Sequence, residues 1–346
     1  MSPIIKEYAR LLRIPGLGGL SIAPAFGAIS VGVLEIQQLS LLFLIGALAA
    51  IYGFVLNDYM DVKIDTLSKE LHNRPLVKGT VSKNAALIIC SLAFIMALII
   101  IFMFFYGDYL SFYYGFMCII LSAIFGTLYN IYGKRIIGSD FLLALSEALL
   151  VLFGALMVVH DGALTIFTWI IFILTFNQLL YMNAVEGGIK DADHDHLMKV
   201  NNIALASGVK VTEDNKLIIT PIFRAFGLGI RLFSVILVYI PFVFYKETFE
   251  PWQIFILTIL VIGMLYSSAK LLFLKEFKRN NIRKLIVSQT FLRYSLVPIM
   301  LIPFIATLTT TTLGGVIYAL ILTIFPFLWY ILFTPLIGEK LFRPGL

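Results

Sequence analysis

The chain has 346 residues and a formal net charge of +6, and 60% of its residues are hydrophobic while 13% are charged. Soluble domains contain about 45–50% apolar and about 25% charged residues, so this composition and a mean hydropathy of +0.97 exclude a set of soluble domains. The two cysteines, Cys90 and Cys118, both lie inside apolar runs. A disulfide framework and a thiolate zinc site are therefore excluded as well.

Apolar runs recur along almost the whole chain, and each is long enough to cross the hydrocarbon core of a bilayer, roughly 30 Å thick, as a helix. The breaks between the runs carry turn or charge signals. We therefore predict an all-α fold, a polytopic transmembrane bundle of nine to ten helices. The candidate spans, in chain order, are 14–34, 39–57, 84–106, 111–132, 139–159, 163–185, 221–245, 252–274, 286–307 and 313–335.

The basic residues predict the orientation of these helices. Of the 26 Lys and Arg residues, Lys246 alone falls on the side opposite the N-terminus when ten spans are counted. Cytoplasmic loops carry the excess of Lys and Arg, so we expect a multi-pass protein of the cell membrane with both termini in the cytoplasm. The positive charge then reports topology, and it gives no support to a nucleic-acid partner.

Two polar loops, 58–83 and 186–220, are much longer than the others, and four helices separate them along the chain. Because an even number of crossings returns the chain to the same side, both loops emerge on the cytoplasmic face. We expect the active-site cavity to open at this face.

The first long loop opens with acidic residues at helical spacing. Asn57, Asp61 and Asp65 recur every four residues, and Asp58 lies three before Asp61. If the preceding helix continues past the membrane edge, these four side chains share one helical face. Carboxylates on one face repel one another, and a bound cation reverses the sign of that interaction. Oxygen ligands without His or Cys suit Mg²⁺, which takes further ligands from water and substrate phosphates.

The second long loop carries a matching pair, Asp191 and Asp195, which are again four residues apart, with Glu186 and Asp193 close by. Basic residues lie on the same side of the membrane. Metal ions with arginine and lysine side chains around them can neutralise a diphosphate leaving group. The basic candidates are Arg13, Arg74, Lys134 and Lys190.

The sequence resembles the UbiA superfamily of intramembrane prenyltransferases over roughly residues 8–300. The family signature Asn-Asp-x-x-Asp-x-x-x-Asp is matched by residues 57–65, and the Arg-Pro-Leu-x-x-Gly segment that follows it is matched by residues 74–79. A second signature, Asp-x-x-x-Asp, is matched by residues 191–195. Two shorter elements of the family are matched by Leu12-Arg13 and by Tyr132, Lys134 and Arg135.

This resemblance implies Mg²⁺-dependent transfer of a polyprenyl group from an allylic prenyl diphosphate to a hydrophobic acceptor in the membrane. The residues that it implies as catalytic are Asp58, Asp61, Asp191 and Asp195. The Mg²⁺ ligands that it implies are Asn57, Asp58, Asp61, Asp65, Asp191 and Asp195. The expected diphosphate contacts are Arg13, Arg74, Lys134 and Lys190.

The acceptor stays open at this stage. An aromatic quinone precursor could be attacked directly by the allylic cation, whereas an isoprenoid glycerol phosphate or another lipid-linked alcohol must lose a proton. Glu186 or Asp193 could serve as the base that removes it. Two arginines near helix ends, Arg231 and Arg293, are expected to extend toward the cytoplasmic interface.

A secondary transporter is the alternative from a different class, because ten helices with intramembrane polar residues also suit one. Transporter acids lie near the bilayer midplane, often at broken helices, whereas these acids cluster at one membrane face. The prenyltransferase is therefore favoured. We expect residues 1–310 to form its domain, with motif loops 57–83 and 186–208, and residues 311–346 to add a transmembrane helix and a short basic tail.

Overall fold

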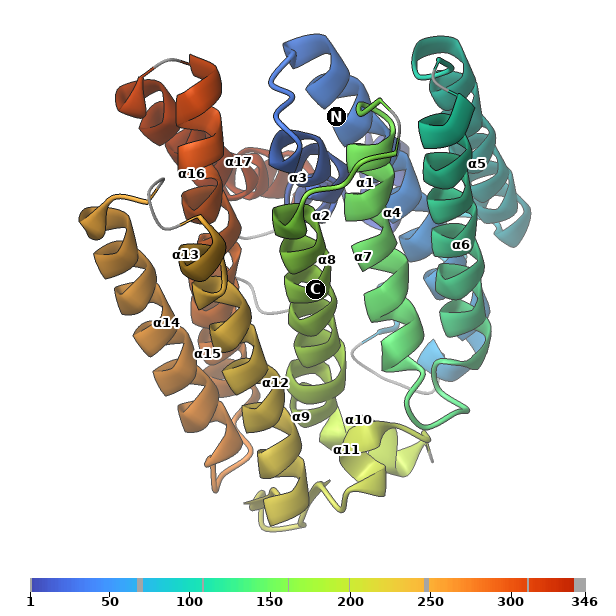
Figure 1. Ribbon diagram of the computed structural model, residues 1–346. Coiled ribbons are helices and arrows are strands. Elements are labelled where there is room, and N and C mark those ends of the chain that lie inside the picture. The colour runs from blue at the N-terminus through green and yellow to red at the C-terminus, as the bar shows by residue number, and fades with distance from the viewer. Residues whose placement is uncertain are drawn as a thin grey trace. The chain divides into compact units, whose positions relative to one another are not determined.

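Helices dominate the computed structural model, which describes residues 2–66, 71–107, 109–160, 162–198, 200–245, 249–309 and 311–338 (Figure 1). Within these residues, nine helical stretches are long and apolar enough to cross a bilayer. The chain is thus an all-α, polytopic membrane protein, as predicted. The remaining predicted span, 139–159, is also a helix, but its 17 residues extend only about 25 Å.

The chain divides into two compact units. The first unit consists of Met1–Ile131, Leu149–Thr165 and Ile321–Leu346, and the second of Tyr132–Ala148 and Ile166–Leu320. Three helices contribute residues to both units: α7 (Asp140–Leu156), α17 (Thr312–Leu336) and, by its last residue alone, α6 (Tyr109–Tyr132).

The first unit begins with a broken helix and continues with three long ones. The first stretch is divided into three pieces. It breaks at Leu12 and Arg13, and each of the two helices that follow has a proline in its first turn. Proline fits that position and not the interior of a helix. The other helices of this unit are α1 (Pro3–Leu11), α2 (Ile14–Leu20), α3 (Ala23–Ser30), α4 (Ile36–Asp65), α5 (Lys83–Phe104) and α6 (Tyr109–Tyr132).

Helix α4 is the element that matters most for function in the first unit. Its 30 residues extend about 45 Å, which is more than the hydrocarbon core requires. The helix runs through the acidic residues and ends only at Asp65, so the side chains of the first acidic signature lie on one continuous helix. Helix α5 returns alongside α4.

Helices α3 and α7 cross closely within the first unit, and glycine makes the crossing possible. A Cβ atom at Gly27 would collide with the carbonyl oxygen of Val151, and one at Gly154 would collide with the carbonyl oxygen of Pro24. Small residues at such crossings let helix backbones approach each other in a membrane.

The C-terminal helix α17 contacts the start of the chain, where the Trp329 indole donates a hydrogen bond of 2.7 Å to the Ile14 carbonyl. Whether residues 311–346 are an addition to the prenyltransferase domain stays a prediction.

The second unit packs its long helices around a core that includes Tyr181, Val185 and Phe223. Helix α12 contacts both α8 and α14 (Figure 1). In chain order its elements are α8 (Ile166–Leu180), the π-helix η1 (Tyr181–Gly187), α9 (Gly188–Lys190), α10 (Ala192–Leu197), α11 (Ile203–Ala206), β1 (Lys210–Val211), β2 (Leu217–Ile218), α12 (Pro221–Tyr239), α13 (Pro241–Phe244), α14 (Pro251–Leu272), α15 (Arg279–Tyr294) and α16 (Leu296–Thr309).

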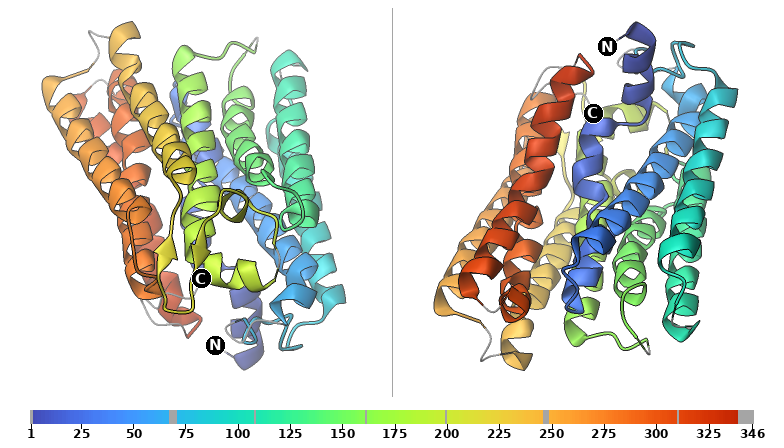
Figure 2. Two further views of the ribbon diagram at one scale, coloured as in Figure 1. Left: turned by 90° about the horizontal axis from the view of Figure 1, so that it is seen from below. Right: turned by 90° about the horizontal axis from the view of Figure 1, so that it is seen from above.

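The prediction that residues 186–220 form a loop was wrong for the first residues, which are helical. The rest of the segment contains short helices and a hairpin that were not predicted. The helix that begins at Ile166 continues through η1 and α9 to Lys190. Strands β1 and β2 form an antiparallel hairpin. This hairpin lies against the connection between α14 and α15, where the Leu217 amide donates to the Lys275 carbonyl at 2.9 Å (Figure 2).

Candidate functional site

The first acidic cluster lies on the last turns of α4, where the sequence pattern placed it. The side chains of Asp58, Asp61 and Asp65 are buried, with 5%, 8% and 1% of their residue surface exposed. Asn57 is half-buried on the same stretch. Buried carboxylates require charged partners or a metal ion, so the contacts of this cluster decide what it can bind.

Two arginines reach the cluster from outside α4. The Arg13 guanidinium binds Asp58 Oδ1 at 2.6 Å. Arg74 binds two carboxylates at once, Asp58 Oδ1 at 3.1 Å and Asp65 Oδ2 at 2.6 Å. Burial by itself lowers the pKa of Arg74, but the carboxylates of Asp58, Asp65 and Asp61 outweigh it and raise that pKa. Both arginines therefore present fixed positive charge at the acidic cluster.

Local backbone geometry places each of these arginines. Arg13 has a left-handed conformation, with φ 47° and ψ 43°, at the break between α1 and α2. This conformation costs a residue other than glycine about 1–2 kcal/mol, and it persists where surrounding contacts hold it. The Arg13 guanidinium lies 4.9 Å from the centroid of the Phe54 ring, in addition to its ion pair with Asp58.

Arg74 belongs to a compact turn formed by residues 74–79. The Lys78 amide donates to the Arg74 carbonyl at 2.8 Å, and the Thr80 amide donates to the Pro75 carbonyl at 3.0 Å. Gly79 closes the turn with φ +75°, a conformation that glycine adopts without steric cost. The Arg-Pro-Leu-x-x-Gly segment therefore forms a turn that places the Arg74 side chain against α4.

The second acidic cluster lies in the second unit, at the end of the extended α8–η1–α9 helix. Asp191 connects α9 to α10 and forms an ion pair of 3.4 Å with Lys190. Asp195 in α10 accepts a hydrogen bond of 2.6 Å from Asn202. Burial and then the neighbouring Asp191 carboxylate raise the pKa of Asp195 to about 6, against the opposing influence of Lys134. The Asp191 carboxylate thus disfavours the negative charge of Asp195.

Two asparagines, Asn201 and Asn202, organise this second cluster, and neither was among the predicted site residues. The Asn202 side chain caps α11, where its Oδ1 accepts from the Leu205 amide at 2.8 Å, while its Nδ2 binds Asp195. The Asn201 amide donates to the Lys134 carbonyl at 3.1 Å. Asparagine before a short apolar helix is a capping signal, so the role of Asn202 was detectable in the sequence.

The two predicted candidates for a base are both bound to arginine. Asp193 receives two hydrogen bonds from Arg279, at 2.7 and 2.9 Å. Glu186 binds Arg293 at 2.8 Å and Arg231 at 3.5 Å. Both carboxylates are therefore engaged in ion pairs in this structure, and a role for either residue as the base stays a prediction.

The prediction that Arg231 and Arg293 extend toward the cytoplasmic interface was wrong. Arg231 is fully buried and Arg293 is 6% exposed. The long side chains turn inward because Glu186 offers them a carboxylate inside the helix bundle, where a charge is tolerated when it is paired.

The chemistry of the side chains in both clusters fits Mg²⁺. In the part of the chain that the structure describes, no group of three or more His, Cys, Asp or Glu side chains converges closely enough to hold a metal ion. The available donors are nevertheless carboxylate oxygens and, at Asn57, an amide oxygen. Mg²⁺ prefers such oxygen ligands, and it binds through one or two carboxylates while substrate phosphates complete its shell.

Comparison of the sequence with known proteins identifies a family and a related enzyme. The UbiA prenyltransferase family model matches residues 19–289. A digeranylgeranylglyceryl phosphate synthase of Saccharolobus solfataricus is 30% identical over 268 residues, which are 71% of this chain and 89% of that protein.

Solved structures share the fold. A structure described as giving insights into a digeranylgeranylglyceryl phosphate synthase in membranes aligns with a TM-score of 0.62 and 22% identity, covering 91% of this chain and 99% of the other. A UbiA homolog from Archaeoglobus fulgidus bound to GPP and Mg²⁺ aligns with a TM-score of 0.59 and 17% identity, covering 86% and 99%.

The helical membrane fold and these matches together define an integral membrane prenyltransferase. The chain belongs to the UbiA prenyltransferase family. The resemblance carried by residues 57–65, 74–79 and 191–195 is thereby confirmed, and the transporter alternative gains no support.

Proposed function

We propose that this enzyme transfers a polyprenyl group from an allylic prenyl diphosphate to a glyceryl phosphate that already carries an isoprenoid chain. The observation that carries this choice of acceptor is the 30% identity to a digeranylgeranylglyceryl phosphate synthase, extending over 89% of that protein. An aromatic acceptor is the second candidate in the same enzyme class.

In this proposal the first cluster holds Mg²⁺ through Asn57, Asp58, Asp61 and Asp65. Arg13 and Arg74 already bind these carboxylates, so a diphosphate bound beside the metal would lie within reach of both guanidinium groups. Guanidinium groups bind phosphate oxygens through paired hydrogen bonds. The two arginines therefore neutralise the diphosphate and fix its orientation.

The second cluster contributes Asp191 and Asp195 as Mg²⁺ ligands, with Lys134 and Lys190 as diphosphate contacts. The raised pKa of Asp195 supports this role, because two carboxylates that repel each other are stabilised by a shared cation. Bound Mg²⁺ supplies charge neutralisation of the diphosphate oxygens.

The arginine and lysine side chains of the site stabilise the reaction most as the bond between the prenyl carbon and the diphosphate oxygen breaks. Negative charge then collects on the departing diphosphate, and the preplaced guanidinium and ammonium donors bind it more strongly than they bind the substrate. The apolar helices exclude water, which would otherwise capture the allylic cation. The acceptor hydroxyl attacks that cation and loses its proton.

The orientation of the protein forms part of the proposal. The distribution of Lys and Arg supports both termini and both acidic clusters at the cytoplasmic face, with the active-site cavity opening there. A single cysteine placed near Lys78 should then be labelled by a membrane-impermeant reagent from the cytoplasmic side and not from the other.

The decisive experiment measures diphosphate release from geranylgeranyl diphosphate by the purified protein. Geranylgeranylglyceryl phosphate and an aromatic quinone precursor are supplied in separate reactions, each with and without Mg²⁺. We expect Mg²⁺-dependent release with the glyceryl phosphate. Release with the aromatic acceptor alone would replace the proposed substrate, and the absence of release with any acceptor would remove the proposal.

A further inference from the structure

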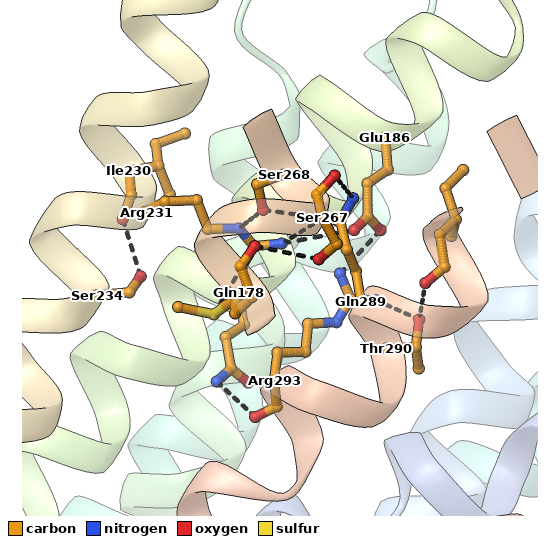
Figure 3. A network of polar contacts seen from close by, with 12 residues as sticks. Gln178, Glu186, Ile230, Arg231, Ser234, Ser267, Ser268, Gln289, Thr290 and Arg293 are labelled. Atoms are coloured by element: carbon orange, nitrogen blue, oxygen red, sulfur yellow. Dashed lines mark hydrogen bonds and ion pairs between the residues drawn. The ribbon is translucent and has the colours of Figure 1, made fainter. Parts of the chain in front are cut away.

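A buried polar network links four helical elements of the second unit and contains none of the proposed Mg²⁺ ligands. Glu186 of η1, Arg231 of α12, Ser268 of α14, and Gln289 and Arg293 of α15 converge in it (Figure 3). Arg231, Ser268 and Gln289 have no exposed surface, and Glu186 has 1%. The catalytic proposal uses none of these residues.

Arg231 lies at the centre of the network. Its Nε donates to Ser268 at 3.0 Å, its Nη2 donates to Gln289 at 3.0 Å, and its Nη1 donates to the Met264 sulfur at 3.8 Å. Gln289 is fixed in turn by the Ser268 hydroxyl, which donates to it at 3.1 Å. Helices α14 and α15 thereby hold the Arg231 guanidinium in one orientation.

The same guanidinium contacts η1 at two positions. It lies 3.5 Å from the centroid of the Tyr181 ring, a close cation–π contact. It also pairs with Glu186 at 3.5 Å. Arg293 binds the second oxygen of Glu186 at 2.8 Å, so the carboxylate is held from two sides.

Tyr181 and Glu186 share a side of the helix because η1 is a π-helix. In an α-helix, two residues five apart point about 140° away from each other. Hydrogen bonds from i to i+5 widen the turn, and residues five apart then lie little more than one turn apart. A single guanidinium can therefore contact both residues in the π form, which the α form would not allow.

The winding of η1 sets the direction of the segment after it. Helix α9 and Asp191 continue directly from Gly187, where η1 ends. A return of seven residues to α-helical winding would rotate that segment by on the order of a quarter turn. Asp191 and Asp195 would then point elsewhere.

We propose that Arg231 is a positioning residue that holds η1 in its π form and so determines where Asp191 and Asp195 lie. The inference rests on the proposed role of these two aspartates as Mg²⁺ ligands. Its effect on the reaction is exerted through the helix backbone and not through contact with the substrate.

Because two arginines bind Glu186, the substitution of one can be compared with the substitution of the other as a matched control. Arg231→Met leaves Glu186 paired with Arg293, so no buried carboxylate is left without a partner. Arg293→Met removes an arginine from the same network but leaves Arg231 in contact with Glu186 and Tyr181. Comparison of the two separates the loss of a buried arginine from the loss of the contact with η1.

The first readout is a distance that does not depend on activity. Spin labels are attached to Leu197→Cys in α10 and Ile222→Cys at the start of α12, which are 79% and 74% exposed, in a chain with Cys90 and Cys118 replaced by alanine. We expect one narrow distance distribution in the parent and in Arg293→Met, and a shifted or broadened one in Arg231→Met. If Arg231→Met does not fold, Tyr181→Leu serves the same test, because it removes the cation–π contact between Arg231 and η1.

The second readout is the Mg²⁺ concentration that gives half-maximal transfer. We expect Arg231→Met to raise it by roughly tenfold or more, as for other residues that orient metal ligands, and Arg231→Lys to restore part of the loss. An unchanged distance distribution in Arg231→Met, or an equal change in Arg293→Met, would overturn the inference. Failure of the proposed function is distinct, because the parent protein would then show no Mg²⁺-dependent transfer while the distances still report on η1.

Discussion

The two acidic clusters carry similar motifs but are held in different ways. The first lies on a continuous α-helix and is bound directly by Arg13 and Arg74. The second comes after a π-helix, and Asp195 receives its hydrogen bond from the amide of Asn202. Arginines from outside the helix preorganise the first cluster. In the second, Asp191 pairs with the adjacent Lys190, and helix winding and the capping residue Asn202 set the placement. Substitutions at the first should therefore act on charge, and those at the second on placement.

The largest effect is expected for Asp58→Asn. Asp58 accepts from both arginines, so its neutralisation disconnects the two cations as well as removing a metal ligand. We expect kcat/KM to fall by at least about 1,000-fold, or about 4 kcal/mol, while the protein remains folded in detergent. Transfer assays and thermal unfolding measure the two quantities, and activity close to that of the parent would contradict direct charge organisation of the first cluster.

Arg74→Lys tests how much of that organisation depends on shape. Arg74 binds Asp58 and Asp65 through the same nitrogen, Nη1. A lysine keeps the charge and has N–H donors, but it lacks the rigid planar geometry that fixes the direction of the two bonds. We expect a loss of roughly 10- to 100-fold in kcat/KM, with a smaller loss for Arg13→Lys, since Arg13 has one carboxylate partner among the described ion pairs. Equal losses at both positions would argue against the special role of the bridging arginine.

Asn202→Ala probes the second cluster without changing charge. It removes the cap of α11, worth about 1 kcal/mol, together with the hydrogen bond to Asp195. We expect a loss of roughly tenfold in transfer and an increase in the Mg²⁺ concentration required. Asn201→Ala, which loses a side-chain bond to the Arg135 carbonyl, is the neighbouring control and should change the Mg²⁺ requirement less.

The smallest effect is expected for the Asp193–Arg279 pair. It joins α10 to α15 at a partly exposed position, where ion pairs contribute up to about 1 kcal/mol to stability. A double-mutant cycle with Asp193→Asn and Arg279→Gln should give a coupling of that size in thermal unfolding, with transfer within about threefold of the parent. Loss of transfer in Asp193→Asn alone would favour Asp193 as the base.

The parts of the molecule that could be predicted are those determined by residues close together in the sequence. The four-residue spacing of Asn57, Asp61 and Asp65 is a local helical pattern, and helix α4 continues to the end of it. The turn that holds Arg74 is likewise marked by its own proline and glycine. Span positions can be predicted from hydropathy, which depends on each segment alone.

The parts that the sequence interpretation missed join residues far apart along the chain. Glu186 and Arg293 are separated by 107 positions, and Asp193 and Arg279 by 86. No local pattern specifies such pairs, so the two arginines of the buried network were expected near the membrane surface. The π-helix was missed for a related reason, since the contacts that favour it come from α12.

The glycine crossing of α3 and α7 bears on the path of the substrate. Backbone carbonyls at Val151 and Pro24 occupy the space that even a methyl group would need at Gly27 and Gly154. No hydrocarbon chain can pass between α3 and α7 at that point. A prenyl tail that enters sideways from the bilayer must use a different pair of helices.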